Sequence, residues 1–196
     1  MNDKINKLLH LLIDMRGIDF IIFIIMFIVM FVSGCVNNFQ TIKRGVSVMK
    51  IYSPEFKDNS FIPKKFTCDG MDINPRLLFE DIPEGTESLV LIIDDPDAPT
   101  GTWVHWVLFN IPKNVTDIPE DAVPDNAIQG LNSWSKNNYG GPCPPSGMHR
   151  YFFKLYALDI LLELDDTATK KDVEQAMQGH IIEKAEYVGL YKRDIE

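Results

Sequence analysis

Beyond residue 46, apolar residues come in short runs that alternate with segments rich in proline, aspartate, asparagine and glycine. Short apolar runs bounded by turn-forming residues are typical of β-strands. The pattern predicts strands at residues 47–52, 65–68, 76–79, 88–94, 103–110, 150–158 and 187–191. We therefore expect a mainly β domain over residues 47–196.

Only one segment has a convincing helical period. Its apolar side chains are spaced to share one helix face, and they belong to Val173, Ala176, Met177 and Ile181. Thr169, followed three residues later by Asp172, resembles a capping box that would begin this helix. A second short helical turn is predicted at residues 181–186. Helices are thus expected to be short and peripheral.

The predicted strand at 103–110 is apolar on both faces, which indicates a central position in a sheet. Because side chains alternate between the two faces of a strand, His105 is expected to lie on the face of Trp103, Val107 and Phe109. A single histidine in such a strand is usually a core residue. A functional interpretation of His105 therefore needs other polar groups nearby.

The stretch from Tyr139 to Phe153, Y-G-G-P-C-P-P-S-G-M-H-R-Y-F-F, joins a loop directly to a strand. Its glycines and prolines prescribe an unusual backbone path. By alternation His149 and Tyr151 share one face, and Arg150 points the other way. This predicts two polar rings at the entrance of a strand whose continuation is core, and we interpret the stretch as one wall of a binding site.

A second polar cluster, D-D-P-D-A-P at residues 94–99, follows the apolar run 89–93. The prolines stiffen a turn that presents carboxylates at the sheet edge. Such a turn is commonly only a solvated acidic loop, but one carboxylate could orient a histidine or contact a ligand. A metal site is the weaker alternative, because neither HExxH nor a close histidine pair supports it; it would use Asp95, Asp97, His105 and His149. We expect no metal and no cofactor.

Residues 1–34 are predicted to be a signal peptide or membrane anchor. Phe20–Val32 is an uninterrupted apolar run, shorter than the roughly 20 residues of a spanning helix. The V-S-G-C that follows resembles a bacterial lipobox with lipid attached to Cys35, and an uncleaved anchor is the alternative. Residues 35–46 are polar and are interpreted as a tether. On either interpretation the domain is expected outside the cytoplasm and attached to a membrane.

The chain has 196 residues, of which 45% are apolar, and a formal net charge of -9 at pH 7. The first 34 residues contribute nothing to that charge, because three basic and three acidic residues balance, so the acidity belongs to the folded domain. A core of about 150 residues buries enough surface to fold without a metal or disulfide framework. The acidity argues against nucleic acid as a partner, and an anionic ligand would need local donors.

A nucleophile is harder to find in this sequence. Ser146 lies in P-P-S-G and not in a G-x-S-x-G elbow. Cys143 could act as a thiolate with His149, yet a thiol outside the cytoplasm is more often oxidised. With Cys35 assigned to lipid, Cys68 and Cys143 either form a disulfide or remain two buried thiols.

Two imidazoles, a tyrosine hydroxyl and the amides of a glycine-rich turn are hydrogen-bonding groups suited to a small oxyanion such as phosphate. Three motifs now resemble one known family: D-P-D-A-P at 95–99, W-V-H-W at 103–106, and Y-G-G-P-C-P-P-S-G-M-H-R-Y-F-F-K-L-Y-A-L-D at 139–159. Together they resemble the phosphatidylethanolamine-binding protein family, in its bacterial and archaeal, Raf-kinase-inhibitor-like branch. The resemblance extends over about residues 48–194.

The resemblance implies a large central antiparallel β-sheet, a smaller second sheet and short peripheral helices. It also implies a pocket for phosphate or small phosphorylated head groups. Carried over by position, the residues of that pocket are Asp95, Pro96, His105, Gly141, Pro142, His149 and Tyr151, with Trp106 on its wall. In the same pattern Asp97 and Arg150 are structural.

These observations predict a membrane-tethered binding protein with a preformed pocket for a phosphate-like group. Two other classes stay open: a slow hydrolase that uses the acid and base groups of the same pocket, and an inhibitor that engages a protease or signalling partner. A homodimer is kept as a hypothesis. Anion affinity is expected to rise as pH falls, because protonated His105 or His149 would add positive charge. Replacement of His149 with Ala is expected to abolish binding and to leave folding nearly intact.

Overall fold

Two largely buried strands, β4 (Ser88–Asp95) and β8 (Met148–Leu158), pair antiparallel at the centre of the fold. They belong to a computed structural model of the chain that describes residues 47–193. The predicted signal segment, Cys35 and the tether lie outside the described residues. The apolar runs that identified these strands in the sequence therefore also form the middle of the main sheet.

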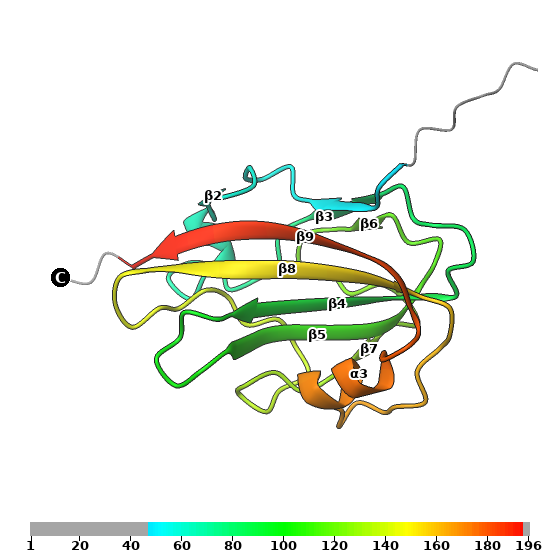
Figure 1. Cartoon of the computed structure of the whole chain (residues 1–196). Helices are drawn as coiled ribbons and strands as arrows, with labels where there is room; N and C mark the ends of the chain where they lie inside the picture. The colour runs from blue at the N-terminus through cyan, green and yellow to red at the C-terminus, as the bar shows by residue number, and fades with distance from the viewer. Residues whose placement is uncertain (1–46, 194–196) are drawn as a thin grey trace, which may run out of the picture. The chain divides into compact units, whose positions relative to one another are not determined.

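The main sheet has six strands in the order β2-β9-β8-β4-β5-β7 (Figure 1). Its other members are β5 (Trp103–Pro112), β9 (Ile181–Lys192), β2 (Ser60–Phe61) and β7 (Ile128–Gln129). Neighbouring strands are antiparallel except β2 and β9, which are parallel. A second sheet has the order β1-β3-β6, formed by β1 (Lys50–Tyr52), β3 (Leu77–Glu80) and β6 (Asp117–Ile118). The predicted architecture of a large and a small sheet is confirmed.

The main sheet separates two hydrophobic clusters, because successive residues of β4 point to opposite faces. Leu91 belongs to the cluster that includes Ile51 of β1, and we call this side the small-sheet face. Ile92 belongs to the cluster that includes Val173 of α3 (Lys170–Ala176), and we call this side the helix face. All four side chains are almost fully buried.

The helix α3 is the one α-helix among residues 47–193, and its predicted start is confirmed. The hydroxyl of Thr169 accepts a hydrogen bond from the backbone N–H of Asp172, whose carboxylate accepts from the backbone N–H of Thr169. These two bonds satisfy donors that a helix start leaves free. No helix in this part of the chain is long and apolar enough to cross a membrane.

Two predicted elements are wrong. Residues 65–68 are not a strand, because Pro63 begins a 3-10 turn at Lys64–Phe66 instead. Residues 181–186 are not helical, because they form the first half of β9 and pair with β8. In the second case the hydrogen bonds and side-chain contacts of a long neighbouring strand outweigh a weak local helical period.

Candidate functional site

The end of β4 and the start of β8 bring Asp95 and His149 together. Asp95 Oδ2 lies 2.6 Å from His149 Nδ1, and Asp95 Oδ1 accepts the backbone N–H of Asp97 at 2.8 Å. Pro96 lies between the two aspartates and is exposed. Both members of the pair are buried, with 3% of Asp95 and 7% of His149 exposed. The carboxylate therefore orients the imidazole through Nδ1, and Nε2 has no protein partner among the described residues.

An irregularity in β5 places His105 near this pair. Ile93 of β4 pairs with Trp106, but the next residue, Asp94, pairs with Val104. His105 is thus an extra residue in β5, which is the definition of a β-bulge. A bulge changes the alternation of side chains at the point where it occurs.

The predicted grouping of His105 with Val107 and Phe109 is therefore wrong, whereas its grouping with Trp103 agrees with the structure, because both rings contact Trp134. Val107 and Phe109 pack on the helix face, whereas the His105 ring contacts residues of the opposite side. Its ring centroid lies 5.1 Å from that of Tyr151 and 5.2 Å from that of Trp134, both in edge-to-face geometry. The bulge thus turns the histidine out of the apolar cluster and toward the polar end of β8.

The imidazole of His105 is held in one tautomer. Its Nδ1 lies 2.7 Å from the carbonyl oxygen of Gly140, which can only accept, so Nδ1 carries the proton. Burial lowers the pKa of His105 below its ordinary value, because a charged ring would lose hydration. The ring is therefore neutral near pH 7, with Nε2 as an acceptor.

Tyr151 lies against His105 and contributes an unsatisfied group. Its side chain is 1% exposed, and its hydroxyl has no hydrogen-bond partner within residues 47–193. Burial raises the pKa of this hydroxyl, so it stays protonated. A buried hydroxyl without a partner is costly, and it can be satisfied by a ligand or by water.

A pocket of about 240 Å³ opens beside these groups. We call it the first pocket, and the residues of its wall include Asp95, Trp103, His105, Trp134, Cys143 and Pro145. No lysine or arginine from residues 47–193 lines it. An anion in this pocket would therefore be held by neutral donors such as hydroxyl and backbone N–H groups, and a neutral imidazole Nε2 could accept only from a protonated oxygen of the ligand.

The predicted ligand residues divide into three groups. Asp95 and His105 line the first pocket, and His149 and Tyr151 are buried in direct contact with them. Pro96 shapes the turn of the Asp95 carboxylate but does not line the pocket. The remaining three predicted residues have other partners.

Gly141 and Pro142 do not line the first pocket. The amide of Gly141 donates to Asp72 Oδ1 at 2.6 Å, and the carbonyl of Pro142 accepts from the amide of Cys68 at 3.2 Å. A Cβ at position 141 would come within 2.6 Å of Asp72 and of the Phe66 carbonyl oxygen, so glycine is required by close approach. The Gly141 amide that we expected to face an anion is already used.

Trp106 does not line the first pocket either. Its side chain is fully buried in the small-sheet cluster, and Nε1 donates to Gln129 Oε1 at 2.9 Å. Its ring contacts Tyr139 edge to face. Trp106 is thus a core residue, and Trp103, on the other side of the bulge, takes the position on the wall.

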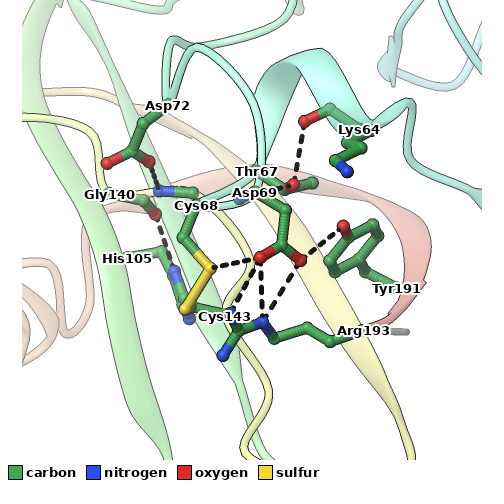
Figure 2. Close-up of a disulfide and its surroundings, with 11 residues drawn as sticks. Lys64, Thr67, Cys68, Asp69, Asp72, His105, Gly140, Cys143, Tyr191 and Arg193 are labelled. Carbon is green, nitrogen blue, oxygen red and sulfur yellow. Dashed lines mark hydrogen bonds and ion pairs between the residues drawn. A yellow bond between two sulfur atoms is a disulfide. The ribbon is translucent and has the colours of Figure 1, made fainter. Parts of the chain in front are cut away.

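A disulfide joins Cys68 to Cys143, with their Cα atoms 5.4 Å apart (Figure 2). Next to it, Asp69 accepts from the Tyr191 hydroxyl at 2.8 Å and from the Arg193 guanidinium. The bond fastens the loop that carries Cys143, and with it one wall of the first pocket, to the turn after Phe66.

Ion pairs hold the two strand ends that carry the site. Arg150 binds Asp97 through Nε at 2.8 Å and Nη2 at 2.7 Å, and this contact lowers the pKa of Asp97 to about 2. On the helix face the buried carboxylate of Asp94 contacts Lys154 at 2.8 Å and Lys170 of α3 at 2.5 Å. Asp94 in β4 and Asp97 in the turn after it are therefore both held by side chains on one face of β8, where Arg150 and Lys154 flank the Phe152 ring.

The chemistry of other site types finds little support here. Within residues 47–193 no three His, Cys, Asp or Glu side chains are grouped so that they could hold a metal ion. Cys143 is in a disulfide and cannot serve as a thiolate, and Ser146 is exposed in the loop.

Sequence reasoning missed Trp134 as part of the pocket wall. The available signal was its setting, because a large aromatic residue within the polar stretch N-S-W-S-K-N-N has no apolar neighbours to pack with in sequence. Trp103 and Cys143 lay within motifs already noted, but their positions relative to the bulge and the loop decide that they face the pocket.

Comparison with known proteins gives the family. The family described as phosphatidylethanolamine-binding protein matches residues 52–192. The chain belongs to the phosphatidylethanolamine-binding protein family. A UPF0098 protein of Aquifex aeolicus is 49% identical over 164 residues, covering 80% of this chain and 96% of the relative. A UPF0098 protein of Methanothermobacter thermautotrophicus is 47% identical, covering 74% and 99%.

Solved structures agree with this membership. YbcL of Escherichia coli, described as a new member of the mammalian family, is 30% identical with a TM-score of 0.71, covering 76% of this chain and 100% of that one. A family homologue from Chlamydia trachomatis is 42% identical with a TM-score of 0.73, covering 75% and 99%. The bacterial and archaeal branch is thus confirmed, and family membership implies an anion- or phosphate-binding pocket.

Proposed function

We propose that the domain binds phosphate or a small phosphorylated head group in the first pocket, outside the cytoplasm, while the N-terminal segment holds it at a membrane. The observation that carries the binding proposal is the group of polar side chains beside the pocket. His105 and His149 each use Nδ1 on the protein, which leaves Nε2, and the Tyr151 hydroxyl lacks a partner. The hydroxyl can donate to a ligand oxygen, and each Nε2 can accept from a protonated ligand oxygen or, once protonated itself, donate to a bare one.

Binding is favoured over hydrolysis through a covalent intermediate, because the site offers a base without a protein nucleophile. The Asp95 and His149 pair has the geometry of an oriented general base. Cys143, however, is oxidised and Ser146 is exposed, so neither provides a protein nucleophile next to it. Turnover of a phosphorylated ester that is lost with His149→Gln would contradict this assignment.

Affinity for sulfate, whose charge stays constant, is expected to rise about tenfold from pH 8 to pH 5.5. The reason is that a proton taken up by an imidazole beside the pocket would convert its Nε2 from an acceptor into a charged donor. His105 contributes less, because its lowered pKa keeps the ring neutral over most of this range. Isothermal titration of the full-length chain in detergent measures the change.

Two matched variants separate the histidines. His149→Gln should remove the pH dependence, whereas His105→Gln should keep it. Affinity that weakens toward acid in the unaltered protein would contradict the proposal. The buried His105 also has a stability consequence of opposite sign: because the unfolded chain binds its proton more readily, stability is complete above about pH 6.5 and decreases below it.

The tether has its own test, since it rests on residues outside the described part. Mass spectrometry of the protein extracted from membranes is expected to find an N-terminal Cys35 that carries a diacylglyceryl group. An intact Met1 would contradict the lipoprotein assignment. Resistance of the domain to protease added to cells with a permeable outer layer would contradict the location.

A further inference from the structure

One buried side chain organises the turn that precedes the pocket loop. Asn132 is 6% exposed, and its Oδ1 accepts the backbone N–H groups of Trp134 at 2.9 Å and Lys136 at 3.1 Å. Its Nδ2 donates to the backbone carbonyl of Asn138 at 2.9 Å. Within this turn Ser135 has φ +57°, a conformation that side-chain-bearing residues rarely adopt. The turn is therefore fixed. It carries three exposed residues at alternate positions in the sequence, Trp134, Lys136 and Asn138.

Trp134 stands between the first pocket and a second one. The second pocket, of about 200 Å³, lies along the same loop, and Trp134 and Cys143 line both. The indole lies directly against the backbone at Gly140, where an added Cβ would come within 2.5 Å of Trp134 Cζ3. The ring is 41% exposed although it is large and apolar. Its free surface is thus available to a ligand that extends from one pocket to the other.

The lining of the second pocket combines donors with acceptors. Lys136 offers an ammonium, Asn138 a side-chain amide and Asp72 a carboxylate. The Asp72 carboxylate uses Oδ1 on the Gly141 amide and has Oδ2 left. One positive and one negative group give this lining no net charge.

This balance selects a chemical class. A second anionic group on the ligand would be repelled by the carboxylate of Asp72. An ammonium group on the ligand would be repelled by the ammonium of Lys136. A hydroxyl both donates and accepts, so several hydroxyls could use all of these groups. The C–H face of a sugar ring would at the same time cover the exposed indole, which combines an apolar body with little conformational freedom.

We propose that the ligand is a sugar phosphate or phosphorylated polyol, with its phosphate in the first pocket and its hydroxyl-bearing part on Trp134 in the second. The inference rests on the proposed function, because it takes the phosphate site as given. Trp134, Lys136 and Asn138 are specificity-determining residues of this ligand. The groups that hold the phosphate are separate from Lys136 and Asn138, which do not line the first pocket.

The test compares inorganic phosphate, phosphoethanolamine and glucose 1-phosphate by isothermal titration of the full-length chain in detergent. Glucose 1-phosphate is expected to bind about tenfold more tightly than inorganic phosphate. The ratio of the two dissociation constants is the readout, because any general effect of a substitution on phosphate binding cancels in it. Lys136→Met, Asn138→Ala and Trp134→Ala should each bring the ratio toward one, whereas Trp134→Phe, which keeps an aromatic face, should retain most of it.

Three results would overturn the inference. One is equal affinity for glucose 1-phosphate and inorganic phosphate. That result would keep the proposed phosphate site and reject only the role of the second pocket in ligand binding. Another is a preference for phosphoethanolamine, which would assign the second pocket to an ammonium group. Absence of binding by all three compounds would overturn the proposed function and this inference together.

Discussion

Loss of the Cys68–Cys143 disulfide is expected to lower the free energy of unfolding by about 4 kcal/mol. The bond joins residues 75 positions apart, and a cross-link over such a long loop removes much of the conformational entropy of the unfolded chain. Chemical denaturation of the oxidised protein and of a Cys68→Ser, Cys143→Ser double variant measures the difference.

The chain offers a matched control for this experiment. Cys35→Ser also removes a cysteine but leaves the disulfide intact, so it should not change the free energy of unfolding. A difference below about 1 kcal/mol for the double variant would show that strain or residual structure offsets the cross-link. We also expect weaker phosphate binding by the double variant, because Cys143 forms part of the pocket wall.

His149→Ala is expected to destabilise the domain by about 3 kcal/mol in addition to weakening anion binding. The sequence placed His149 at an open strand entrance, but only 7% of the residue is exposed. Its removal would leave the buried Asp95 carboxylate with the backbone N–H of Asp97 as its remaining protein donor in the described structure. The earlier expectation of nearly unchanged folding does not fit this burial.

A double-mutant cycle isolates the interaction. In an Asp95→Asn background no carboxylate remains at that position, so His149→Ala should cost much less, with a coupling of about 2 kcal/mol by chemical denaturation. His149→Gln, which can still donate a hydrogen bond to Asp95, should lie between the unaltered protein and His149→Ala. Additive effects of the two substitutions would contradict a stabilising pair.

Much of the fold follows from the sequence, because its strongest strands carry clear apolar runs. The direction of the side chains at the start of β8 was also predictable from alternation. Tyr151 packs on the small-sheet face, and Arg150 points away from it and binds Asp97. The same rule failed in β5, since alternation assumes that each residue advances the strand by one step. Both faces of β5 are apolar, so nothing in its composition reveals the extra residue at His105.

Other parts of the site could not be predicted because they depend on partners distant in sequence. The Gly141 amide looked available until Asp72, 69 residues away, was found to accept from it. The role of Asp95 was partly predictable, because the sequence allowed one carboxylate of the acidic turn to orient a histidine. Which histidine it orients is decided by the pairing of β4 with β8.

The bulge in β5 also limits how this site can be transferred to another protein. Grafting W-V-H-W into a regular strand would return the imidazole to the opposite face, among apolar side chains. A functional graft must therefore include β4 as the template for the changed register, together with the loop whose Gly140 carbonyl holds His105. The smallest unit that could be transplanted is therefore β4, β5 with its bulge, and the loop that contains Gly140. Transfer of the four-residue motif alone would reproduce its sequence but not the position of the imidazole.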